Sequence, residues 1–165
     1  MQLRPATADD LPFLIQMLLE AYNWDGTPSF DEERLRSDDH AVRYVDAWPR
    51  ANDFGVVAEI DGERAGAAWA RALTADRPGY GYVADDVPEL SLGVSPEFRR
   101  RGVARALLAE LIAQARAASY RQLSLSVDPG NVARKLYESF GFRKVGVNGT
   151  SDTMILDLQP DSTSG

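Results

Sequence analysis

The sequence predicts a mixed α/β domain in which helices pack over a mainly antiparallel sheet. Residues 90–94 alternate apolar with small or polar side chains, which is the two-residue period of a β-strand. In the segment 104–115 the apolar residues instead recur at helical spacing. Two further alternating runs are joined by Asp61-Gly62, a dipeptide typical of a tight hairpin. Strands joined by a hairpin and separated by amphipathic helices predict this fold class.

The other elements follow in chain order. Strands are predicted over 2–6, 56–60, 65–71, 90–94, 122–127, 142–147 and 154–158, and helices over 11–19, 31–48, 104–115 and 131–140. Thr7 or Asp9 is placed to cap the first helix, and Pro12 fits its first turn. Gly141 is placed to end the last helix, with its apolar residues turned inward. The segment 74–87, rich in Gly, Pro and Asp, is predicted as a loop.

Length and composition fit one folded domain. A chain of 165 residues with 44% hydrophobic content can bury a real core. No internal repeat or low-complexity linker divides it. We therefore expect a single domain over residues 1–160 and a disordered tail over 161–165.

Charge and residue counts exclude several function classes. The absence of cysteine excludes thiolate chemistry, and a single histidine argues against a metal site. A formal net charge of −7 argues against nucleic-acid binding, because neutralising phosphates needs an excess of basic residues. The sequence contains no apolar run that would span a bilayer and no signal-peptide pattern at its start, so we expect a cytoplasmic protein without membrane contact.

A basic turn interrupts this acidic sequence. Arg99, Arg100, Arg101 and Gly102 stand between the predicted central strand and the helix that begins near Ala104. The first turn of a helix has unpaired N–H groups and the positive end of the macrodipole. A glycine there allows the backbone to approach an anion closely. The turn is therefore predicted to bind phosphate, although a solvated basic turn has the same composition.

Two motifs resemble the GCN5-related N-acetyltransferase (GNAT) family. The acyl-CoA motif of that family, Arg or Gln, two residues, Gly, one residue, then Gly or Ala, stands here as Arg99 to Ala104. The second is the downstream run NVARKLYESFGF, residues 131–142. Both motifs occur in the expected order with a strand between them, and the order of elements over nearly the whole chain also fits. The resemblance implies the GNAT fold, with two splayed strands that form an acyl-CoA cleft.

The resemblance implies which residues meet the donor, acetyl-CoA, with no metal required. In the family, the backbone of the central strand pairs with the pantetheine arm, and an amide near Val94 faces the thioester oxygen. Gly93 would fit a β-bulge that separates this strand from 122–127. The expected cofactor-binding residues are Leu92, Val94, Arg99, Arg100, Arg101, Gly102, Val103, Ala104, Arg105 and Asn131. Leu92 and Val94 are expected to turn their side chains into the core, and Asn131 to cap its helix as well.

Two residues are candidates for proton transfer. The resemblance makes Tyr137 the general acid that protonates the departing thiolate, whereas packing with Leu136 and Phe140 is its structural alternative. Glu89 is the candidate general base, acting directly or through water, and an exposed strand-end carboxylate is its alternative. Asp85 and Asp86 are reserve candidates for the base.

These residues predict an acetyl-CoA-dependent N-acetyltransferase, an acyltransferase in which a primary amine attacks the bound thioester directly. The acceptor is a small molecule, or a protein or peptide amino group, and the sequence does not select among them. A domain of the same fold that binds acyl-CoA without turnover is one alternative, and transfer of another acyl group is a second. Nucleic-acid binding rests only on the three arginines. Dimers are common in the family, so a homodimer is an open expectation.

Overall fold

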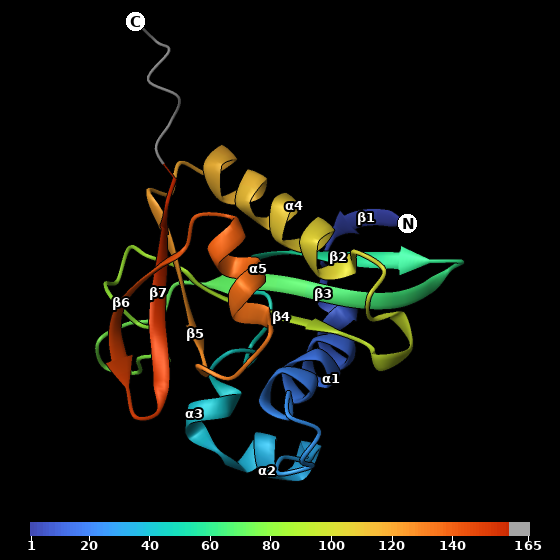
Figure 1. Cartoon of the computed structure of the whole chain (residues 1–165), viewed down its shortest axis with the longest axis horizontal. Helices are drawn as coiled ribbons and strands as arrows, with labels where there is room; N and C mark the ends of the chain where they lie inside the picture. Colours follow the sequence, from blue (N-terminus) through green and yellow to red (C-terminus); the bar gives the residue numbers. More distant parts are fainter. Residues whose placement is uncertain (159–165) are drawn as a thin grey trace, which may run out of the picture. The chain divides into compact units, whose positions relative to one another are not determined.

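Seven strands form one sheet in the computed structural model, which describes residues 1–158. The strands are β1 (Gln2–Pro5), β2 (Phe54–Ile60), β3 (Glu63–Arg71), β4 (Glu89–Val94), β5 (Gln122–Val127), β6 (Arg143–Asn148) and β7 (Ser151–Asp157). The helices are α1 (Leu11–Tyr22), α2 (Glu32–Ser37), α3 (Asp39–Val42), α4 (Val103–Ala117) and α5 (Ala133–Ser139). The hydrogen-bonded order is β1-β2-β3-β4-β5-β7-β6 (Figure 1). The pairs β1–β2, β2–β3, β5–β7 and β6–β7 are antiparallel, and β4–β5 is parallel, which confirms the predicted fold class.

The chain divides into two compact units. The first contains residues 1–71 and 91–111, and the second contains 72–90 and the chain from 112 onward. Strand β4 and helix α4 each have residues in both units.

Close packing of two helices on strands organises the first unit. A Cβ at Gly66 of β3 would lie 3.1 Å from side-chain atoms of both Val103 and Leu107, so α4 packs directly on this strand. A Cβ at Gly93 of β4 would lie 2.4 Å from the carbonyl oxygen of Met17, so α1 packs there by its backbone. Figure 1 shows these strands passing between the two helices. Gly93 is thus required by helix packing, a reason other than the bulge expected from the sequence.

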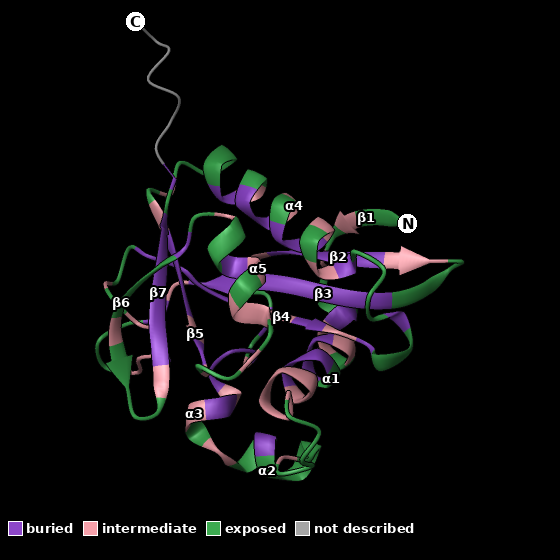
Figure 2. Cartoon of the chain, in the orientation of Figure 1, coloured by how far each residue is buried: buried purple, intermediate pink, exposed green. Residues whose placement is uncertain are grey.

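The predicted hairpin joins β2 to β3. Asp61 and Gly62 have φ values of 52° and 80°, the left-handed backbone that both central residues of a type I′ turn adopt. The twist of this turn matches the twist of the flanking strands. The register shifts once between Ala58 and Glu59, and beyond that shift Val57 pairs with Ala67. Val57 and Ala67 are wholly buried in the core, and Figure 2 shows the middle of β3 as buried.

A buried carboxylate holds the start of the chain. Asp10 is wholly buried, and both of its oxygens accept hydrogen bonds from Arg4 at 2.8 Å. The backbone N–H of Thr7 donates to Asp10 Oδ2 at 2.7 Å, and Arg64 Nε donates to Oδ1 at 3.1 Å. Burial alone would raise the pKa of Asp10, but these hydrogen bonds, chiefly from Arg4, hold it well below its usual range. This arrangement fixes β1 and the entry to α1.

The second unit is built on β5, β7 and β6. Register partners along β5 and β7 include Leu125 opposite Met154, both buried (Figure 2). At the edge of the sheet, β6 leaves Val145 and Val147 exposed. Gly141, with φ of 101°, follows α5 at the position predicted to end that helix.

The segment 31–48 differs from its prediction as one helix. It forms the short helices α2 and α3, followed by turns. Asp38 is the cause: its backbone is extended, and its side chain accepts N–H groups of His40 and Ala41. A short polar side chain that caps a new helix ends the preceding one.

One smaller correction concerns the last helix, and one expectation is not tested. Val132, predicted to face inward on the last helix, is 82% exposed and lies before the first residue of α5. The expected tail over 161–165 lies outside the described residues.

Candidate active site

The basic turn has a backbone suited to an anion. Arg100 and Gly102 both have positive φ, 63° and 78°, on either side of Arg101. Such alternation of backbone conformation turns successive N–H groups toward one side and forms an anion-binding concavity. The 15-residue helix α4 begins at Val103, so the free amides of its first turn point the same way.

The turn also has room for a ligand. A Cβ at Gly102 would meet no heavy atom within 4 Å, and residues 99–102 are exposed. Open space in front of convergent N–H groups at the positive end of a helix fits a pyrophosphate.

Two of the arginine side chains already have partners within the first unit. Arg99 Nη2 lies 2.8 Å from Glu20 Oε2 on α1. The Arg101 guanidinium carbon lies 5.5 Å from the centroid of the Phe98 ring, the geometry of a cation–π contact. These two side chains are therefore engaged with Glu20 and Phe98 of the same unit.

The central strand differs from expectation in its side chains. Leu92 and Val94, expected in the core, are only partly buried, whereas Leu90 is 4% exposed. Alternate residues of a strand share a face. The face that is closed at Leu90 is therefore partly open at the two later positions, where the family resemblance places the pantetheine arm.

Glu89 is a buried carboxylate. Its residue is 3% exposed, and Oε2 accepts the backbone N–H of Gly81 at 3.1 Å. This burial excludes the alternative of an exposed strand-end carboxylate. In the described chain, the parallel register between β4 and β5 consists of one pair, Glu89 opposite Ser124. The N–H of Ser124 donates to the carbonyl of Pro88 at 2.9 Å, which fixes the start of β4 beside β5.

Only glycine can occupy position 81 without displacing backbone. A Cβ there would lie 2.5 Å from the carbonyl carbon of Leu125, 2.7 Å from its oxygen and 2.8 Å from the nitrogen of Ser126. The segment 72–88 thus lies directly on β5. That close approach delivers the Gly81 amide to Glu89.

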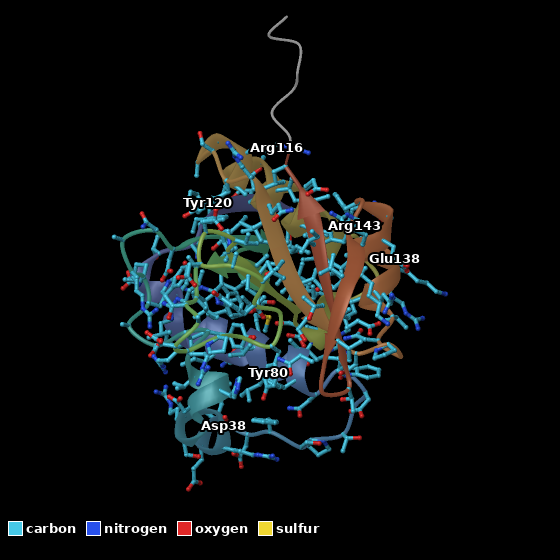
Figure 3. The ribbon with its side chains drawn as sticks, turned by 90° about the vertical axis from the view of Figure 1, so that its left-hand side faces the viewer. Asp38, Tyr80, Arg116, Tyr120, Glu138 and Arg143 are labelled. Carbon is cyan, nitrogen blue, oxygen red and sulfur yellow. The ribbon has the colours of Figure 1, made fainter. Side chains whose placement is uncertain are left out.

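The rest of the segment 72–88 is tied down by hydrogen bonds. Asn148 Nδ2 on β6 donates to the carbonyl of Tyr80 at 3.2 Å (Tyr80 is labelled in Figure 3). Asp85 accepts the hydroxyl of Tyr82 and the N–H of Ala75. These bonds give Asp85, a reserve candidate for the base, a structural role.

Tyr137 is the second buried titratable group of the candidate site. It is 7% exposed on α5 and meets the Phe142 ring edge-on, with centroids 5.8 Å apart. Burial raises the pKa of Tyr137 to about 12, so its hydroxyl keeps its proton at neutral pH. Asn131 Oδ1 accepts the N–H of Ala133, the first residue of α5, at 2.9 Å, and the N-cap position itself is Val132, one residue later than predicted.

Sequence reasoning missed Gly81 and Ser124. The first stands between two tyrosines in a stretch that reads as an ordinary loop, GYGYVADDV. The second is the small residue of an alternating strand and is wholly buried. The sequence alone does not show that Ser124 is a polar residue on a buried face of β5. That becomes clear only when its burial is known.

Comparison with known proteins identifies the family. Residues 15–142 match the model of the Acetyltransferase (GNAT) family. Phosphinothricin N-acetyltransferase of Alcaligenes faecalis is 35% identical over 144 residues, which cover 84% of this chain and 68% of that protein. The crystal structure of a ribosomal-protein-alanine N-acetyltransferase from Brucella melitensis is 28% identical, with a TM-score of 0.66 over 95% of this chain and 98% of that one.

Structures solved with the cofactor share the fold. The protein yncA of Salmonella typhimurium, solved with acetyl-CoA, has a TM-score of 0.70 and 20% identity over 98% of both chains. The PaiA N-acetyltransferase of Thermoplasma acidophilum, solved with coenzyme A, has a TM-score of 0.68 and 18% identity over 95% of this chain and 99% of that one.

The chain belongs to the GNAT acetyltransferase family, and the relationship supports acyltransferase activity in general. In the part of the chain that the structure describes, no three His, Cys, Asp or Glu side chains cluster in a way that could hold a metal ion. Among residues 1–158, no helix has the length and apolar character needed to cross a membrane.

Proposed function

We propose that this protein is an acetyl-CoA-dependent N-acetyltransferase that moves the acetyl group of the thioester to a primary amine by direct attack in a ternary complex. The observation that carries the proposal is the turn before α4, whose alternating backbone and open front fit a pyrophosphate. Such a turn could bind many anions, and membership of the GNAT family favours acyl-CoA as the ligand.

The residues divide the work of binding. Backbone amides from Arg101 to Arg105 would hold the pyrophosphate at the N-terminus of α4. Arg99 and Arg100 belong to the same turn, and the backbone at Leu92 and Val94, whose side chains are only partly buried, would pair with the pantetheine arm. Asn131, whose side-chain oxygen accepts the Ala133 N–H, retains its amide N–H groups for a contact with the cofactor. When bound, acetyl-CoA supplies the activated acetyl group.

Glu89 and Tyr137 would move the protons. An alkylammonium must lose a proton before it can attack, and a buried carboxylate held by the Gly81 amide can take that proton. Tyr137 keeps its own proton because burial raises its pKa to about 12, so its hydroxyl is available to protonate the departing sulfur. An amide near Val94 would donate to the thioester oxygen, an interaction often worth about 3 kcal/mol in kcat.

The acceptor is best identified by assay. The relatives named above are a phosphinothricin N-acetyltransferase and a ribosomal-protein-alanine N-acetyltransferase, among others. We propose release of coenzyme A as the readout against a panel that contains phosphinothricin, free amino acids, polyamines and peptides with N-terminal alanine. If acetyl-CoA binds but no amine in the panel releases coenzyme A, the result favours the binding domain without turnover.

The cofactor site has its own test. At about 100 times its Kd, acetyl-CoA should stabilise the fold by about 2.7 kcal/mol. That raises the thermal midpoint by about 5–10 °C in a protein of this size. The double variant Arg101→Glu with Gly102→Glu should lose this increase, because it places two negative charges at the turn. Arg116→Glu, in the last turn of α4, makes the same charge reversal away from the turn and should keep the increase. An unchanged increase in the double variant would refute the phosphate assignment.

The single domain over 1–160, the cytoplasmic location and the homodimer stay predictions. They concern the whole protein in solution and in the cell. Size-exclusion chromatography with light scattering would measure the oligomeric state of the purified protein.

A further inference from the structure

Ser124 carries a buried hydroxyl that the fold itself does not use. The residue is wholly buried in β5, and its backbone N–H is used by the carbonyl of Pro88. Its Oγ has no hydrogen-bond partner among the described residues. A buried hydroxyl without a partner costs stability, and native proteins keep few of them. Alanine would occupy the site with one atom fewer and without that cost, so the hydroxyl points to a role other than folding.

The position of the hydroxyl suggests that role. Ser124 is the register partner of Glu89 in the parallel β4–β5 pair, and neighbouring strands lie about 4.8 Å apart. Register partners send their side chains to the same face of a sheet. The buried carboxylate and the buried hydroxyl therefore leave the sheet side by side. Ser124 Oγ makes no direct hydrogen bond to the Glu89 carboxylate. A water molecule that hydrogen-bonds both groups would bridge them.

The hydrogen bond between the Gly81 amide and the Glu89 carboxylate supports this geometry. Oε2 accepts the Gly81 amide, which fixes the carboxylate from the side of the segment 72–88. The steric fit of Gly81 against Leu125 fixes that amide in turn. The carboxylate is thus held between two elements of the second unit, and the hydroxyl of Ser124 lies at its register position on β5.

From this we infer that Ser124 is a positioning residue for Glu89, and that its hydroxyl holds the water through which a proton passes from the acceptor ammonium to the carboxylate. The N–H bond of the ammonium breaks and its proton joins the water, while the water gives one of its own protons to a Glu89 oxygen. Ser124 keeps its proton and only hydrogen-bonds the water. The amine is left neutral, with the electron pair it needs for attack. The inference rests on the proposed function.

Ser124→Ala separates this role from a structural one. We expect kcat to fall about tenfold with KM for acetyl-CoA unchanged, since a lost proton path slows the step without touching the cofactor. The thermal midpoint without coenzyme A should stay the same or rise, because an unpaired buried hydroxyl is removed. Ser124→Thr, which keeps a hydroxyl, should recover most of kcat.

A proton inventory gives a second readout. In mixtures of H2O and D2O, kcat of the unaltered protein should fall along a curve, because more than one proton moves, and kcat of Ser124→Ala should fall on a straight line. Ser139→Ala is the matched control: this serine is exposed on α5 and donates to the Leu136 carbonyl. The control should match the unaltered protein in both measurements.

The outcomes are distinguishable. If Ser124→Ala keeps kcat within twofold and the same curvature, the inference is wrong while the proposed function stands. A fall in kcat that comes with a lower thermal midpoint and no recovery in Ser124→Thr also overturns it, because the role is then structural. If the unaltered protein acetylates no amine, the proposed function fails and the inference fails with it.

Discussion

Replacing Gly81 by alanine tests how the candidate base is held. The added Cβ would lie 2.5 Å from the carbonyl carbon of Leu125, whereas ordinary contact begins near 3.4 Å. The segment must therefore retreat from β5 by about 0.9 Å, the difference between the two distances. A retreat away from the carboxylate would lengthen the present 3.1 Å from the Gly81 nitrogen to Glu89 Oε2 to about 4.0 Å, beyond a hydrogen bond.

Both losses have a known scale. Strain from one extra methyl group against packed backbone typically costs about 1–3 kcal/mol. A hydrogen bond to a charged group contributes about 1.5–3 kcal/mol. With partial relaxation we expect a net loss of about 2–3 kcal/mol in the free energy of unfolding. For a chain of 165 residues that lowers the thermal midpoint by about 4–12 °C.

Calorimetry and coenzyme A release measure the two consequences together. We expect Gly81→Ala to lower the midpoint and to lower kcat more than KM for acetyl-CoA, because the carboxylate is displaced and the cofactor turn is not. Gly146→Ala is the control, since a Cβ there meets no heavy atom within 4 Å and its φ is not positive. If Gly81→Ala matches this control in both midpoint and kcat, the close approach and the support of Glu89 are refuted.

Three further predictions concern titrating groups. Because burial raises the pKa of Tyr137 from 10.0 to about 12, the folded state retains a proton that the unfolded state loses, so about 2–3 kcal/mol of stability should disappear between pH 10 and 12. Tyr137→Phe should abolish that share of the alkaline loss in pH-dependent unfolding and cut kcat more than acetyl-CoA binding; turnover that survives intact would mean that another group is the acid. Asp10→Asn should cost about 1–3 kcal/mol at pH 7, and the gap should close as pH falls below about 4, because a carboxylate of lowered pKa stabilises only while it is ionised; a gap that persists in acid would contradict the Arg4 pairing. Glu89→Gln should depress kcat with amine acceptors and alter its pH profile, and an unaltered profile would exclude Glu89 as the base.

Local sequence patterns predicted most of the elements. The alternation in 122–127, the Asp61-Gly62 hairpin and the helical spacing after Gly102 each involve residues within a few positions of one another. Their side chains and backbones interact mainly with near neighbours, so the sequence carries the information directly. The segment 31–48 shows the limit: the capping preference of Asp38 outweighed a weak helical pattern.

In the candidate site, too, the sequence predicted local features and not those that depend on distant residues. The basic turn, Glu89 and Tyr137 were visible as residue types at characteristic positions. The sequence did not show whether Glu89 is exposed or buried. Its surroundings include Gly81, eight residues earlier, and Ser124, thirty-five residues later. Leu92 and Val94 were expected to be buried by their alternation, yet periodicity tells which residues share a face and not how far that face is covered.

The sequence by itself predicted the fold class and a basic turn before a long helix, because these follow from short-range periodicity and backbone preference, and the family resemblance supplied the candidate residues for acetyl transfer. Only the tertiary structure decided the surroundings of Glu89. Parallel strands are joined by a long crossover, so their register depends on packing across the whole unit. That packing brings the Gly81 amide to the carboxylate, pairs Ser124 with Glu89 in register, and buries all three residues.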